Sequence, residues 1–152
     1  MSITGLATFD DTVHTTNSWL ADIKDNLNWS ERGLALKALR TVLHALRDRL
    51  PVHLSANFSA QLPMLVRGLY FEGWTGESTD LKERGLDHFL KPIEDAFSSY
   101  PSVEAETVAL AVFDTIREHI SVGETNKILH ALPHNIRDML DQPFRLKPLK
   151  GL

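Results

Sequence analysis

The sequence LKALRTVLHALRDRLPVHLSANFSAQLPMLVRGLYF, residues 36–71, returns in diverged form seventy positions later, at residues 106–141. The two copies align without a gap, and six of the 36 aligned pairs are identical, against roughly two or three expected from ordinary composition. The identical pairs are Val42 with Val112, Arg47 with Arg117, Val52 with Val122, Leu62 with Leu132, Pro63 with Pro133 and Arg67 with Arg137. We therefore predict a tandem duplication of a helical module.

Helical periodicity is clearest in the first copy. Its longest apolar stripe has alternating spacings of three and four residues and consists of Leu36, Leu39, Leu43, Leu46 and Leu50. This stripe predicts an amphipathic helix over residues 31–50, which Pro51 ends. A preceding helix is expected to end near Leu27, and two shorter helices are expected over residues 52–61 and 63–71.

The second copy predicts helices at matching places. Apolar residues between 86 and 97 indicate its first helix, which Pro92 is expected to kink or split. Further helices are predicted over residues 103–120, 121–131 and 133–140. Polar residues before these helices and those of the first copy supply candidate N-caps, namely Asp10, Asp11, Ser30, Ser102 and Ser121. Ser121 and Glu124 also have the spacing of a capping box.

No segment shows the alternation and turns of a β-hairpin. The predicted fold is all-α, with the tandem four-helix modules packed into one compact helical bundle. The first module spans residues 1–76, the second spans 77–141, and residues 142–152 form a basic C-terminal tail. We expect this tail to be solvated, and docking on a partner or an anionic surface is the alternative.

Composition restricts the classes of function. The chain has no cysteine, which excludes disulfides, thiolate metal sites and a cysteine nucleophile. No stretch approaches the ~20 apolar residues of a membrane span, and no signal peptide is apparent, so we expect a cytoplasmic protein. The net charge of −4 argues against nonspecific nucleic-acid binding, which needs clustered Lys and Arg.

Three runs carry a resemblance to a known family: HALRDRLP at residues 44–51, AQLPM at 60–64 and RGLYFEGW at 67–74. With the echo from Leu132 to Arg137, they resemble the bacterial family of uncharacterised proteins named DUF2267. The resemblance covers nearly the whole chain. It implies a helical fold, and it implies no activity, cofactor or catalytic residue.

The repeat pairs arginines with acids. Arg67 follows Asp48 by nineteen residues, and Arg137 follows Glu118 by the same interval. We expect these pairs to form salt bridges between the second and fourth helices of each module. The functional alternative makes the arginines an anion-binding fork for a carboxylate or phosphate.

The histidines offer weaker candidates. His130 and His134 have a spacing that can bind a metal on one helix face, with His119 nearby in sequence. Pro133 interrupts the helix between them. His44 and Asp48 share the same spacing, but a third ligand is missing. We therefore expect no metal site and no cofactor.

Tyr70, Phe71 and Trp74 cluster where the two copies join. They form either a candidate partner surface or packing for the linker, and packing is the more common use of such a cluster.

No sequence motif of a hydrolase, a phosphate-binding loop or a dinucleotide fold is present. We expect a non-enzymatic helical protein that acts through a protein or small-ligand surface between the two modules. One alternative is an enzyme or small-molecule binder with a pocket between the modules. The other is a nucleic-acid-associated regulator. The partner and the oligomeric state stay open at this point.

Overall fold

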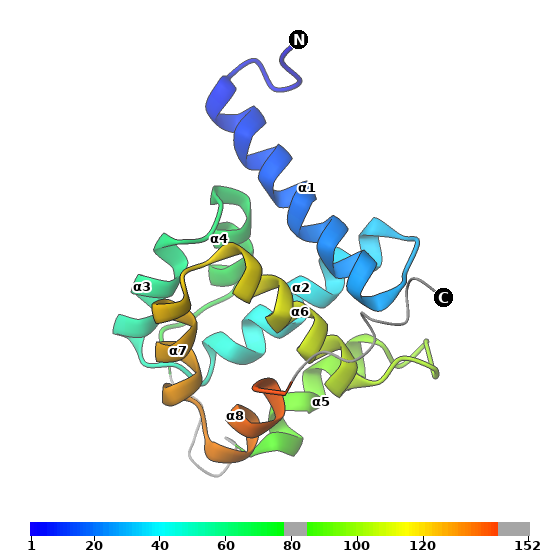
Figure 1. Cartoon of the computed structure of the whole chain (residues 1–152), viewed down its shortest axis with the longest axis vertical. Helices are drawn as coiled ribbons and strands as arrows, with labels where there is room; N and C mark the ends of the chain where they lie inside the picture. The colour runs from blue at the N-terminus through cyan, green and yellow to red at the C-terminus, as the bar shows by residue number, and fades with distance from the viewer. Residues whose placement is uncertain (78–84, 143–152) are drawn as a thin grey trace.

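The computed structural model describes residues 1–77 and 85–142, so the tail from residue 143 lies outside the described part. The described residues form eight helices and no strand, as predicted (Figure 1). The helices are α1 (Ala7–Leu27), α2 (Arg32–Arg47), α3 (Val52–Ala60), α4 (Met64–Phe71), α5 (Leu86–Ala96), α6 (Ala105–His119), α7 (Val122–Ala131) and α8 (His134–Leu140). None of these helices is both long and apolar enough to cross a membrane.

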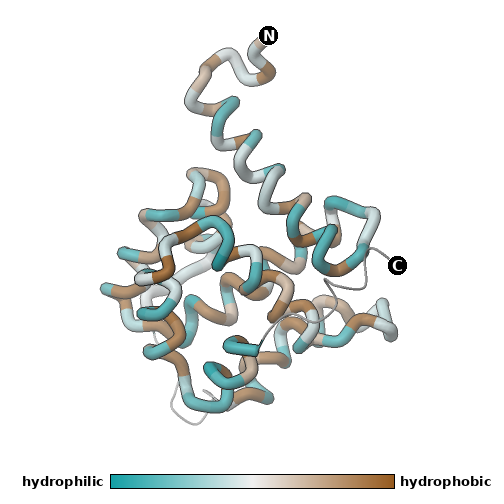
Figure 2. Tube along the Cα trace, viewed as in Figure 1, coloured by the Kyte–Doolittle hydropathy of each residue, from teal (hydrophilic) through white to brown (hydrophobic). Residues whose placement is uncertain are grey.

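The two central helices are α2 and α6, which contact each other and most of the remaining helices. Their apolar stripes are buried, because Leu39, Leu43 and Leu46 on α2 and Val112 and Ile116 on α6 are almost fully inaccessible to water. Figure 2 shows apolar positions recurring along both helices in the middle of the molecule. Burial of such residues is the main favourable term in folding.

The two halves of the chain interlock. Helix α1 packs on α6 as well as on α2, and α5 packs on α2 as well as on α6. Buried Asn26 stabilises the contact between α1 and α6. Its Nδ2 donates to the Ala111 carbonyl oxygen at 3.4 Å and to Thr115 Oγ1 at 3.3 Å. Each half thus completes its core with a helix from the other half.

The predicted N-caps have mixed outcomes. Ser121 caps α7 as expected, since its Oγ accepts from the backbone N–H of Glu124 at 3.2 Å. The predictions for Ser30 and Ser102 were wrong, because Glu31 and Glu104 occupy the N-cap positions of α2 and α6. Neither glutamate makes a side-chain cap, so these helices derive their stability from packing.

Helix α1 begins earlier than predicted, at Ala7. Asp10 therefore lies inside its first turn and accepts hydrogen bonds from Thr4, at 2.9 Å from the backbone nitrogen and 2.7 Å from Oγ1. The Asp11 cap prediction is wrong for the same reason, since Leu6 is the N-cap.

Pro92 does not split its helix, because α5 is continuous through it. Proline removes the hydrogen bond to the carbonyl of residue 88. Both Pro92 and His88 lie on the exposed face, where water can satisfy that carbonyl.

Candidate functional site

Arg67 and Arg137 occupy the same environment in the two halves. Arg67 donates from Nε to the Ser59 carbonyl oxygen at 2.9 Å and from Nη2 to the Leu62 carbonyl oxygen at 3.0 Å. Arg137 repeats this pattern on Leu129 at 3.0 Å and on Leu132 at 3.2 Å. Each arginine therefore adds a donor to carbonyls at or just beyond the end of α3 or α7, where intrahelical partners run out.

In the first half, Asp48 does not pair with Arg67 as the repeat predicted. The nearest cation to Asp48 is its neighbour Arg47, whose Nε lies 3.0 Å from Asp48 Oδ1. Among the described residues, Asp48 and Arg67 do not form an ion pair. Glu118 holds the matching position near the end of α6, while the Arg137 hydrogen bonds above all go to backbone carbonyls. These arginines act as helix caps.

Arg47 and His44 join α2 to α4, a role that the repeat identity of Arg47 and the metal-ligand spacing of His44 did not predict. Arg47 is buried and donates from Nη1 to the carbonyl oxygens of Tyr70, at 3.0 Å, and of Glu72, at 2.7 Å. His44 Nε2 lies 2.6 Å from the Leu69 carbonyl oxygen. Burial lowers the pKa of His44, so the neutral ring donates this hydrogen bond.

The second half keeps the arginine and changes the histidine. Arg117 donates from Nη2 to the Leu140 carbonyl oxygen at 3.4 Å and to Asp141 Oδ1 at 3.1 Å. Asp114 stands where the first half has His44, and it accepts from Asn26 Nδ2 at 3.3 Å. Positions 47 and 117 correspond in the repeat and both hold arginine, and this match was the sequence signal for the two contacts.

The aromatic cluster is largely packing. Tyr70 is fully buried, and its hydroxyl shares a 2.8 Å hydrogen bond with Ser55 Oγ. Burial raises the pKa of Tyr70 to about 12. Phe71 and Trp74 are half-buried, with ring centroids 5.1 Å apart. Tyr70 is therefore a core residue and offers no surface to a partner.

The histidines are dispersed. His119 Nε2 lies 2.7 Å from Asp22 Oδ2, and its ring stacks on Trp19 at 4.7 Å. His134 pairs with Asp138 on the exposed face of α8. Within residues 1–77 and 85–142, no three His, Asp or Glu side chains gather closely enough to hold a metal ion.

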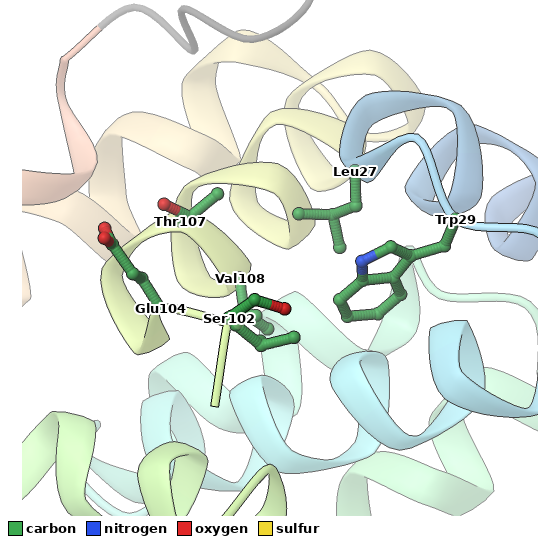
Figure 3. Close-up of a pocket in the computed structure, with 7 residues that line it drawn as sticks. Leu27, Trp29, Ser102, Glu104, Thr107 and Val108 are labelled. Atoms are coloured by element: carbon green, nitrogen blue, oxygen red, sulfur yellow. The ribbon is translucent and has the colours of Figure 1, made fainter. Parts of the chain in front are cut away.

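A groove between the halves is the most site-like hollow. It consists of a cavity of about 310 Å³ between the halves and a neighbouring cavity of about 370 Å³ lined by second-half residues alone, and both border on Val103 and Glu104. We call it the inter-half groove; its lining is Leu27, Trp29, Leu90, Glu94, Ser102, Val103, Glu104, Ala105, Glu106, Thr107 and Val108. In Figure 3, Leu27 and Trp29 from the first half face Ser102 and Val108 from the second.

The groove combines apolar walls with negative charge. Trp29 is half-buried, and its ring packs on Phe97 at a centroid distance of 5.5 Å. Glu104 lines the same cavity as Trp29, and the neighbouring cavity adds the carboxylates of Glu94 and Glu106. Lys37 lies beside Phe97, with its Nζ 5.6 Å from the centre of the Phe97 ring. The lining therefore joins apolar side chains from the first half with three glutamates from the second.

Comparison with known proteins places the chain by sequence. No curated protein matches it. One family matches residues 16–139, a span that begins within α1 and ends within α8. The matched span contains both pairs of arginine caps and the entire inter-half groove. The chain therefore belongs to the family described as uncharacterized conserved protein (DUF2267).

Proposed function

We propose that this protein is a non-enzymatic binding protein, and that the inter-half groove takes a basic peptide segment with apolar side chains. The observation that carries this proposal is the lining of the groove: Leu27 and Trp29 line one of its cavities, Glu94 and Glu106 line the neighbouring one, and Glu104 borders both. An extended peptide alternates its side chains between two sides. Its apolar residues would contact Trp29, and its Lys or Arg residues would contact the carboxylates.

Two features favour binding over catalysis. The histidines that could act as bases are held in structural contacts, with His44 on the Leu69 carbonyl and His119 between Trp19 and Asp22. The groove itself is lined by apolar side chains, hydroxyls and carboxylates, and no histidine is among them. A partially exposed tryptophan in a concave site is a common anchor for peptide side chains.

We also propose that the two halves arose by tandem duplication. Helices α3 and α7 begin seventy residues apart, as do α4 and α8. The arginine caps repeat at the same interval, donor for donor. The groove is a product of this architecture, because one wall comes from the loop after α1 and the other from the start of α6.

The test is binding of a labelled synthetic peptide of alternating lysine and leucine, followed by fluorescence anisotropy. We expect saturable binding that weakens with added salt, because part of the attraction is electrostatic. Glu104→Lys should weaken binding several-fold, since it places a cation inside the groove. Glu77→Lys is the matched control because it makes the same charge change at an exposed position outside the groove.

Equal loss of binding in the two variants would contradict the proposal, because net charge alone would then explain the attraction. A peptide with glutamate in place of lysine completes the design. If it binds as tightly as the basic peptide, the carboxylates of the groove do not select the ligand.

A further inference from the structure

The first turns of α1 stand clear of the other helices (Figure 1). We call residues 2–15 the α1 tip. It carries three exposed apolar side chains, since Ile3 is 88%, Leu6 56% and Phe9 45% exposed. Phe9 lies on the same helix face as Thr12, Thr16 and Trp19, at spacings of three and four residues. The buried stripe of α1 therefore continues into the tip, where nothing in the described chain covers it.

Hydrogen bonds within the α1 tip hold its start. In the first turn of α1, Asp10 accepts hydrogen bonds from both the backbone nitrogen and the hydroxyl of Thr4. The backbone nitrogen of Gly5 also donates to Ser2 Oγ at 2.7 Å. Since α1 begins at Ala7 and Thr12 already contacts α4, these hydrogen bonds hold the start of the helix in place of packing against other helices.

A groove runs beside the tip. Its walls are Thr8, Asp11 and Thr12 of α1 and Pro63, Met64 and Arg67 of the α3–α4 corner, and it encloses about 470 Å³. Thr12 Oγ1 accepts a hydrogen bond from the backbone nitrogen of Leu65 at 3.2 Å, and this bond joins α1 to α4 at the base of the tip. Met64 and Leu65 are 47% and 46% exposed. The molecule therefore presents an apolar ridge next to a groove that combines apolar side chains, such as Met64, with polar and charged ones.

We infer that the α1 tip and this groove form an interface between two copies of the chain. Under a two-fold axis, the ridge of each copy enters the groove of the other, and the same contact is made twice. This inference goes beyond the proposed function and uses a different surface. It also lies partly outside the matched family span, which begins at residue 16.

Charge and area suit a second copy. The groove has Asp11 on its α1 wall and Arg67 on its α4 wall, and Nη1 of Arg67 makes no hydrogen bond among the described residues. Asp11 of one copy can therefore meet Arg67 of the other. The five exposed apolar side chains offer on the order of 500 Å² per copy, and two such patches reach about 1,000 Å², the lower limit for a specific interface.

Sedimentation equilibrium across the micromolar range tests the inference. We expect a monomer–dimer equilibrium whose dissociation constant rises at least about tenfold in Phe9→Asp, because a buried aromatic anchor is lost. Tyr100→Asp is the matched control, since Tyr100 is also exposed but belongs to the loop after α5. Its dissociation constant should not change. Circular dichroism checks that both variants keep their helices.

Cysteine cross-linking gives a second readout, because the chain has no cysteine of its own. A Thr8→Cys copy mixed with a Met64→Cys copy should form a disulfide-linked heterodimer, whereas Thr8→Cys mixed with Val122→Cys should not. The inference is overturned if the wild type stays monomeric throughout, or if Phe9→Asp dimerises as well as the wild type. A monomer that instead binds phosphatidylcholine vesicles through Phe9 would also overturn it, by assigning the tip to a lipid surface.

Discussion

Arg47 and Arg117 hold matching positions on α2 and α6, but their surroundings differ. The side chain of Arg47 is 8% exposed and donates to the carbonyl oxygens of Tyr70 and Glu72 at 3.0 and 2.7 Å. The side chain of Arg117 is 36% exposed and reaches the Leu140 carbonyl oxygen at 3.4 Å. The same residue at the same place in the repeat is thus a buried clamp in one half and a half-exposed contact in the other.

This difference shows that two corresponding residues of a repeat can contribute differently to the free energy of unfolding. A buried carbonyl that loses its donor costs about 1–3 kcal/mol, whereas an exposed one is rehydrated. We call the contact between α2 and α4 the first corner and the contact between α6 and α8 the second corner. His44 adds to the contrast, because it hydrogen-bonds to the Leu69 carbonyl oxygen in the first corner, whereas the second corner has Asp114 at that position. The first corner should therefore be the stiffer of the two.

The largest effects should come from the shared core, where the two halves are alike. Leu46→Ala and Ile116→Ala should each lower the free energy of unfolding by about 2–5 kcal/mol, because both side chains are fully buried. Urea denaturation followed by circular dichroism measures this loss. Asn57→Ala on the exposed face of α3 should stay within about 0.5 kcal/mol. Two separate transitions in either core variant would show that the halves unfold independently.

The arginine clamps come next and test the comparison directly. Arg47→Ala should cost about 2–4 kcal/mol, because the carbonyls of Tyr70 and Glu72 lose a charged donor. Arg117→Ala should cost about 1 kcal/mol or less, since its ion pair with Asp141 is exposed and its hydrogen bond to the Leu140 carbonyl oxygen is long, at 3.4 Å. The same urea experiment measures both losses. Equal losses in the two variants would remove the distinction between the two corners.

The second pair of arginines should behave alike. Arg67 and Arg137 make matching hydrogen bonds at nearly equal distances. Each alanine variant should lower the free energy of unfolding by about 1 kcal/mol, with a difference between them below about 0.5 kcal/mol. Thermal unfolding of the two variants side by side is sufficient. A markedly larger loss for one of them would mean that its cap also supports a neighbouring element.

The smallest expected effect is a pH dependence at the first corner. Burial, the largest cause, lowers the pKa of His44 in the folded protein, so the unfolded state binds its proton at a higher pH. The stabilisation by neutral His44 is present above the unfolded pKa of about 6.5 and is lost as the pH falls below it. His44→Gln keeps a donor for the Leu69 carbonyl and should flatten the stability profile between pH 7 and 5. An unchanged profile would assign the pH dependence to other groups.

The order of the helices was predictable because periodicity and proline punctuation are local signals. Pro63 and Pro133 precede helices as expected, and Ser121 caps α7. Pro51 is the N-cap of α3, whereas α2 ends at Arg47 and is therefore shorter than predicted. The failed caps at Ser30 and Ser102 have a common reason, since packing against the core fixed where α2 and α6 begin. Of the two predictions for Pro92, a kink or a split, the split is wrong, because α5 continues through Pro92 with that residue on its exposed face.

The candidate sites were predicted less well. The sequence showed that Arg67 and Arg137 repeat, but their partners are backbone carbonyls, which have no sequence signature. The inter-half groove was expected only as a surface between the modules. Its lining combines Trp29 with Glu104 across about seventy residues of chain, and that proximity follows from the way the helices cross.

The crossing of α1 onto α6 has a consequence for synthesis of the chain. Trp19 finds its stacking partner His119 one hundred residues later, and Asn26 finds Thr115 almost as far along. A nascent chain that ends before α6 can pack α1 on α2 and α4, but it cannot bury the part of α1 that contacts α6. Contacts so distant in sequence close slowly, so that part of α1 stays exposed until α6 has been synthesised.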